Sequence, residues 1–175
     1  MTDKGFIDPS EQGYWRPLTR LQRSMEAEIS KVYAEAGIEG LKPSWVMELL
    51  RLYARGPMTL TELAESVQRT HSAISQKVAA MRAAGLVRTT AGADARSKQV
   101  TLTAKASRII GLLAAEWRAT EAAAAEIDAE LAYPLSRFVA DMEAALARTS
   151  FHDRIMRHLA QDPDWKPAPN QRPVK

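Results

Sequence analysis

Apolar residues recur along most of this chain at the three- and four-residue spacing of an α-helix. The first stripe starts at Leu18, directly after Pro17, and repeats through Met25 to Val32 before Gly37. Proline suits the first turn of a helix, because its missing N–H would have no partner there. The pattern therefore predicts a helix from Pro17 with one long apolar seam.

A second helix is expected from Pro43 to the residue before Gly56 and Pro57, because proline opens helices and a glycine-proline pair ends them. Its apolar residues group on one side, which is expected to face a core. They are Val46, Leu49, Leu50 and Tyr53.

Two short helices follow, joined by a tight connection. Thr59 and Glu62 form a capping box at the start of a helix over Leu60–Val67, and Thr70 is the expected N-cap of a second helix that Gly85 ends. This order is typical of a helix-turn-helix, although a helical hairpin with a solvated polar face fits the same pattern. The apolar side of the second helix consists of Ile74, Val78 and Met81.

The next segment changes from helical to β periodicity. Two β-prone runs, Leu86–Thr90 and Gln99–Thr103, flank the small, flexible loop Ala91–Ala95. Such a pair predicts a β-hairpin attached directly to the second short helix. A hairpin in this position is the wing of a winged helix.

From Ala104 the chain returns to helical periodicity, with a break at Pro134 and a cap expected at Ser150. The apolar stripes at the two ends exceed what a small winged-helix core can cover, so we expect them to be buried in a two-fold symmetric homodimer.

The expected fold is mainly α with a small β-hairpin wing, of the α+β class. We expect one domain over 14–160, in which dimerisation helices at 14–40 and 104–160 flank a winged helix-turn-helix lobe at 41–103. The ends, 1–13 and the proline-rich 161–175, are expected to be disordered.

Composition narrows the class of protein further. The 175 residues suffice for one ordinary domain, and the absence of cysteine excludes disulfides, thiolate metal sites and thiol redox switching. The N-terminal segment lacks an apolar stretch behind basic residues, and no apolar run reaches a membrane span. A cytoplasmic protein without a membrane partner is therefore expected.

Positive charge is concentrated in the middle of the chain. Between Arg69 and Arg108 there are eight basic residues and a single acid, Asp94, which gives 8 − 1 = +7, whereas the remainder carries 3 − 7 = −4. Such a block favours a polyanionic partner, because each cation that meets a phosphate releases condensed counterions. A solvated basic face is the alternative interpretation.

Three segments together resemble a known family. GPMTLTELAESV, THSAISQKVAAMRAAGLV and DARSKQVTLTAKA are similar, in order and spacing, to the central part of the multiple-antibiotic-resistance regulator (MarR) family of bacterial transcription factors, over about Leu41–Ala106. The resemblance implies a homodimer that places its two winged lobes in successive major grooves of double-stranded DNA at a pseudo-palindromic operator. It also implies repression that a small, often aromatic, effector relieves.

The N-terminal residues of a recognition helix reach base edges first, which selects His71, Ser72, Ser75 and Gln76 as candidate base contacts. Gln76 suits adenine, and the small side chain of Ala73 allows close approach or contact with a thymine methyl. Further DNA contacts are expected from Thr70, Lys77, Arg82, Arg88 and Lys98, chiefly to phosphates.

Arg96, at the expected tip of the wing, is the candidate for insertion into the minor groove, with Asp94 holding its orientation. A surface Asp–Arg pair of little energetic consequence is the alternative.

The sequence gives weaker evidence for an effector, metal or catalytic site than for the DNA contacts. The aromatic candidates for an effector pocket are Tyr14, Trp15, Trp45, Tyr53 and Trp117, although aromatics at helical spacing are more often core residues. No cofactor or metal site is expected, because His152 and His158 do not share a helical face. No catalytic constellation is evident, so the protein is not expected to be an enzyme.

The predicted function is that of a homodimeric, sequence-specific DNA-binding regulator, a repressor released by a small ligand. The alternative is a winged-helix dimer that serves as a protein-interaction or scaffolding module.

Overall fold

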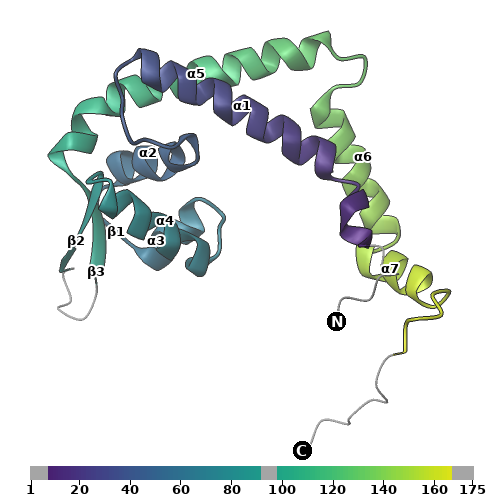
Figure 1. Cartoon of the computed structure of the whole chain (residues 1–175). Helices are drawn as coiled ribbons and strands as arrows, with labels where there is room; N and C mark the ends of the chain where they lie inside the picture. The colour runs from purple at the N-terminus through teal and green to yellow at the C-terminus, as the bar shows by residue number, and fades with distance from the viewer. Residues whose placement is uncertain (1–7, 92–97, 167–175) are drawn as a thin grey trace, which may run out of the picture. The chain divides into compact units, whose positions relative to one another are not determined.

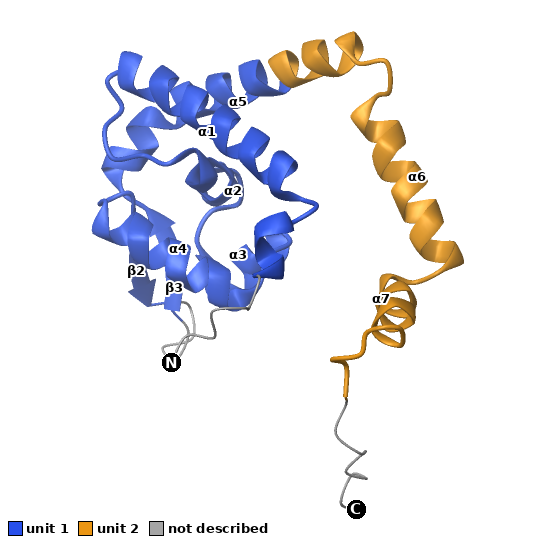
Figure 2. Cartoon of the chain, turned by 45° about the vertical axis from the view of Figure 1, so that its right-hand side comes forward, with its two compact units in different colours: residues 1–121 blue, residues 122–175 orange. Residues whose placement is uncertain are grey.

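The computed structural model describes residues 8–91 and 98–166. The chain divides into two compact units, Met1–Glu121 and Ala122–Lys175, called unit 1 and unit 2 below (Figure 2). Among the described residues, no helix is long and apolar enough to cross a membrane.

Unit 1 contains the predicted helices in the predicted order. The first α-helix begins one residue before Pro17, and the second is preceded by a 3-10 turn at Pro43. The segment expected to be a disordered arm includes a 3-10 turn, which the Asp8 side chain caps. The bounds are η1 Pro9–Gln12, α1 Arg16–Glu35, η2 Pro43–Trp45, α2 Val46–Arg55, α3 Leu60–Ser66, α4 His71–Ala83 and, beginning in this unit, α5 Ala104–Glu130.

The capping box at the start of α3 is present as predicted. The Thr59 hydroxyl accepts a hydrogen bond from the Glu62 N–H at 3.2 Å, and the Glu62 carboxylate accepts one from the Thr59 N–H at 2.7 Å. These bonds satisfy two backbone donors that a helix start leaves without partners. They fix where α3 begins.

Hydrogen bonds from the Thr59 backbone and hydroxyl hold the pKa of the Glu62 carboxyl below its usual range. A lowered folded-state pKa means that the carboxylate stabilises the fold above the unfolded-state pKa and that this contribution is lost as pH falls through the folded value. We therefore expect Glu62→Gln to lower the urea midpoint at neutral pH and to match the wild type in acid. A difference between the two proteins that stays constant from neutral to acid pH would contradict this.

The turn between α3 and α4 depends on one residue in the left-handed region. Gln68 has a φ of 52°, while its N–H and that of Arg69 donate to the carbonyls of Glu65 and Ala64 at the end of α3. Two residues later, the Thr70 hydroxyl accepts from the Ala73 N–H at 3.3 Å and so caps α4. This short connection sets α4 against α3 as a helix-turn-helix.

A three-stranded antiparallel sheet completes the lobe, with β1 Met58–Thr59, β2 Val87–Ala91 and β3 Lys98–Leu102 in the order β1-β3-β2. The predicted hairpin is confirmed, within one residue at each end, by the pairing of Val87 with Leu102 through Ala91 with Lys98. Figure 1 shows β2 and β3 side by side at one edge of the lobe. Strand β1 was not predicted, because two residues are too short to show an alternating pattern.

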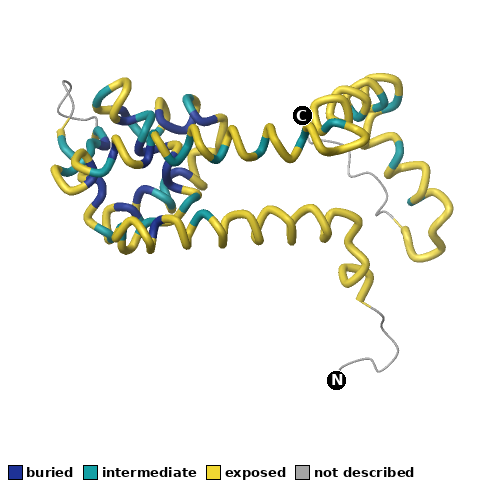
Figure 3. The backbone as a smooth tube through the Cα atoms, turned by 90° about the horizontal axis from the view of Figure 1, so that it is seen from above, coloured by how far each residue is buried: buried dark blue, intermediate teal, exposed yellow. Residues whose placement is uncertain are grey.

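The core lies within the winged lobe and its adjoining helices, where the dark blue segments gather in Figure 3. The predicted core face of α2 is partly wrong, because the Tyr53 side chain is 61% exposed whereas Leu52 is buried. In the structure Glu48 is 1% exposed, since it has an ionic partner inside the lobe.

The wing is also tied to the start of α5. The Thr103 hydroxyl donates to the Gly85 carbonyl at 2.7 Å and accepts from the Ala106 N–H at 3.2 Å. One side chain thus caps α5 and holds it against the segment that follows α4.

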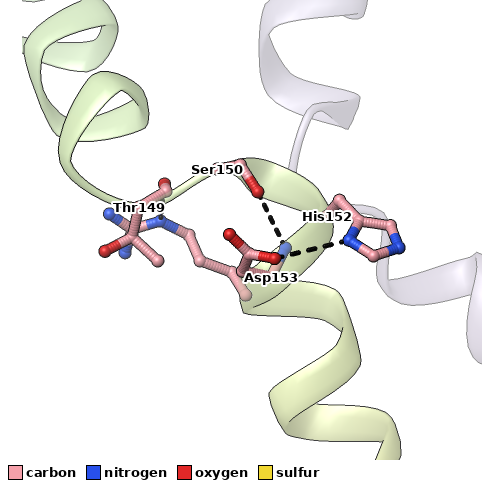
Figure 4. Close-up of polar contacts among 5 residues, drawn as sticks. Thr149, Ser150, His152 and Asp153 are labelled. Carbon is pink, nitrogen blue, oxygen red and sulfur yellow. Dashed lines mark hydrogen bonds and ion pairs between the residues drawn. The ribbon is translucent and has the colours of Figure 1, made fainter.

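Unit 2 consists of the end of α5 together with α6 Leu135–Arg148 and α7 Phe151–Leu159. The Asp128 carboxylate accepts from the Leu135 N–H at the start of α6. Ser150 caps α7, as predicted, by accepting from the Asp153 N–H at 3.0 Å (Figure 4).

The described part of unit 2 contains no buried residue, whereas the core of unit 1 extends to Leu113. The apolar side chains of unit 2 are therefore largely exposed to solvent. The exposed large hydrophobic residues of unit 2 are Ile127, Leu131, Tyr133, Leu135, Phe138, Val139, Leu146, Phe151, Ile155, Met156 and Trp165.

Candidate nucleic-acid interface and adjoining cavity

The polar N-terminal half of α4 faces solvent while its apolar side is buried. Ile74 and Met81 are completely buried. On other sides of the helix, His71, Ser72, Ala73 and Gln76 are exposed, and Ser75 is half-buried. The predicted base-contacting side chains therefore lie on the open part of the first two turns.

A groove of about 470 Å³ runs between α4 and the wing. From α4 it is lined by Ser75, Ala79 and Arg82, and from β3 by Lys98. Two of the predicted cations thus share one concave surface with a predicted base contact. Thr89, Thr90, Ala91, Val100, Leu60 and Val78 complete the lining.

Other predicted contacts are distributed around this groove. On β2 the exposed Arg88 donates from Nε to the Thr101 hydroxyl at 3.2 Å, which ties its guanidinium to the neighbouring strand β3. The hydroxyl of Thr70 is engaged in capping α4. Asp94 and Arg96 lie outside the described residues.

Lys77 is placed differently from the other predicted phosphate contacts. Its ammonium lies 2.6 Å from Glu48 Oε1 on α2, and its side chain is 28% exposed. Residues two apart on a helix lie on nearly opposite sides, so Lys77 faces away from the Ser75 side, where the groove lies. The prediction treated it as a surface cation because its partner lies 29 residues earlier in the chain.

Lys77 lines a second cavity, of about 280 Å³, formed by α1, α2, α4 and α5 within unit 1. Tyr33 on α1 donates to Glu116 Oε2 on α5 at 2.6 Å, and Thr120 donates to Glu116 Oε1 at 2.6 Å. Burial, followed by the effect of Glu116, raises the pKa of the Tyr33 hydroxyl. That hydroxyl therefore remains a hydrogen-bond donor at neutral pH.

Of the predicted effector-site aromatics, the structure brings only Trp117 to this cavity. Trp45 is buried in the core with the Lys42 ammonium over its ring, whereas Trp15 and Tyr53 are exposed. Sequence reasoning missed Tyr33, which the structure places in the cavity wall. Its position was not evident because it lies just beyond the last residue assigned to the apolar stripe of α1.

The described residues contain no group of three His, Cys, Asp or Glu side chains arranged to hold a metal ion. In unit 2, His152 Nδ1 lies 3.5 Å from Oδ1 of the neighbouring Asp153 (Figure 4).

The helix-turn-helix, the antiparallel wing that follows it and the groove between them define a winged helix-turn-helix protein. Residues 39–97 match the model of the MarR family. The winged segment of this chain is therefore similar to the MarR family, in agreement with the resemblance in sequence.

Solved structures show the same fold. The M. tuberculosis transcriptional regulator MOSR, solved in complex with DNA, is 25% identical, with a TM-score of 0.55 over 79% of this chain and 99% of its own. The S. aureus MepR–DNA complex gives 15% identity and a TM-score of 0.57 over 78% of this chain and 97% of its own. A MarR protein from Peptoclostridium difficile is 14% identical, with a TM-score of 0.52 over 88% of this chain and 96% of its own. A comparison with curated protein sequences gave no match.

Proposed function

We propose that this protein is a homodimeric, sequence-specific DNA-binding transcriptional regulator that represses its target and is released by a small ligand. The observation that carries the proposal is the groove between α4 and the wing, which combines exposed polar residues of a recognition helix with Arg82 and Lys98. The solved structures of MOSR and MepR, which have the same fold, contain DNA.

In this proposal, Ser72, Ser75 and Gln76 read base edges while Arg82, Arg88 and Lys98 neutralise phosphates. Asp94 and Arg96 retain the roles proposed for the wing tip. Lys77 is assigned instead to holding α4 against α2, because its ammonium is paired with Glu48.

The homodimer is proposed because apolar side chains on α6 and α7 have no cover in the described chain. A two-fold dimer covers such faces and presents two recognition helices to half-sites about 34 Å apart. A ligand that favours another spacing of those helices shifts the population away from the DNA-bound form. The cavity formed by α1, α2, α4 and α5 is the proposed effector site.

The test is a salt titration of binding to duplex DNA from upstream of the protein's own gene, beside a random duplex of equal length. A regulator should prefer its own promoter and lose about 10³–10⁵ in affinity between about 50 and 200 mM salt. Equal, weak binding to both duplexes would instead favour the scaffolding alternative.

Single substitutions separate the two kinds of contact. Gln76→Ala should cost about 1–3 kcal/mol of operator binding and relax specificity at one base pair, whereas Lys98→Ala should weaken all duplexes equally and reduce the salt slope by about 1. Arg20→Ala, on α1 and outside the basic block, serves as the control for loss of charge alone. If Gln76→Ala discriminates between the operator and other duplexes as well as Arg20→Ala does, Gln76 does not read a base.

A further inference from the structure

We infer that the cavity formed by α1, α2, α4 and α5 binds a compact organic cation, whose ammonium group competes with Lys77 for Glu48 and thereby loosens the recognition helix. This inference rests on the proposed function, since it names the chemical class of the effector and the route by which it acts on DNA binding.

The cavity has an excess of acidic groups. Its lining includes four carboxylates, Glu26, Glu48, Glu116 and Glu121, against two cations, Arg69 and Lys77. Both oxygens of Glu116 accept hydrogen bonds from neutral hydroxyl groups, which leave its negative charge in place. The balance favours a ligand with positive charge and disfavours an anion.

Glu48 is the anchor, because its hydrogen-bonding capacity is only half used. Oε1 lies 2.6 Å from the Lys77 ammonium, but Oε2 is buried and has no hydrogen-bond partner among the described residues. A buried carboxylate oxygen without a donor is costly, so a group that supplies N–H donors there is favoured. A primary ammonium carries three such donors.

The remaining wall suits a small aromatic or aliphatic body. Trp117 and Tyr33 supply aromatic surface, and Ile29, Val46 and Met47 supply apolar surface. Aromatic faces attract cations, which adds to the carboxylate charge. The cavity volume of about 280 Å³ lies near the lower end of the range for small-molecule pockets, which limits the ligand to roughly one ring and a short chain.

The coupling to DNA follows from where Lys77 lies. It is the residue after Gln76 on α4, and its ion pair with Glu48 ties the recognition helix to α2. A ligand ammonium at Oε2 shares the single negative charge of Glu48 with Lys77 and so weakens the ion pair that holds α4. In this proposal, DNA binds the form in which the ion pair holds α4 against α2, and the ligand favours the form in which α4 is released. Each therefore weakens the binding of the other.

Direct binding is measured by calorimetry on the full chain with three probes of similar size: phenethylammonium, phenethyl alcohol and phenylacetate. We expect the cation to bind most tightly to the wild type. Glu48→Gln should weaken it by about tenfold or more, because a charge-assisted hydrogen bond is lost. Glu28→Gln, which neutralises an exposed carboxylate of α1, should leave the affinity for phenethylammonium unchanged. Preference for the anion, or equal affinity in Glu48→Gln and wild type, would overturn the inference.

The variant Glu48→Met/Lys77→Met removes both charges and leaves neither one buried without a partner. It tests the role of Glu48 in cation binding if Glu48→Gln does not fold. On a duplex carrying the operator, phenethylammonium should lower the affinity of the wild type and leave that of the double variant unchanged. Operator binding that the saturating cation does not alter overturns the coupling. Cation binding that depends on Glu48, in a protein that binds no DNA, supports the site and rejects only the proposed regulator.

Discussion

Removal of every residue from Leu135 onward is expected to convert the protein from a dimer to a monomer or an aggregate. The deletion takes away α6 and α7, whose apolar side chains remain exposed in the described chain. Exposed apolar area on this scale is unusual for a monomer and typical of a surface that a partner covers.

Sedimentation velocity across a range of concentrations measures the outcome. The full chain should sediment as a dimer throughout, and the shortened chain should show half that mass or heterogeneous large species. Deleting residues 1–13 should leave the dimer intact. A shortened chain that sediments as a well-behaved dimer would show that α6 and α7 are not the interface.

A pair of point variants makes the same test without deletion. Phe138→Glu places a charge among the exposed apolar residues of α6, and Ser136→Glu adds the same charge at an exposed polar position of that helix. Phe138→Glu should dissociate the dimer because a buried, unpaired charge is costly at an interface. The Ser136 variant should remain dimeric. Equal behaviour of the two would exclude Phe138 from the interface.

Most of the fold could be predicted from the sequence because its signals are local. The capping box of Thr59 and Glu62, the Thr70 cap and the Ser150 cap each depend on residues three apart, and all are present. The wing was predictable for the same reason, since β periodicity on both sides of a small loop specifies a hairpin.

The interior of the cavity could not be predicted, because its contacts join distant parts of the chain. Tyr33 and Glu116 are 83 residues apart, and no local pattern pairs them. The same limit explains the error in α2. A lone glutamate among apolar residues is normally read as solvent-facing, and only the position of Lys77 in three dimensions makes its burial favourable.

Of the single substitutions considered, the one that breaks the ion pair between Lys77 and Glu48 is expected to lower the stability most. Lys77→Met removes the partner of a carboxylate that is 1% exposed and leaves its charge buried. Breaking such a pair from one side costs about 3–5 kcal/mol, and the partial exposure of Lys77 favours the lower end of that range. The free energy of unfolding, measured by urea denaturation, should fall accordingly.

Glu48→Met/Lys77→Met should recover most of that loss, because replacing both members of a buried pair by apolar residues avoids the desolvation of either charge. The matched control is Lys31→Met, which breaks an ion pair with Glu28 in which both side chains are 66% exposed. That change should cost no more than about 1 kcal/mol, since exposed pairs are screened by water and salt. If Lys77→Met and Lys31→Met lower the stability equally, the burial of Glu48 carries no electrostatic cost, and Lys77 is free to meet a phosphate as the sequence predicted.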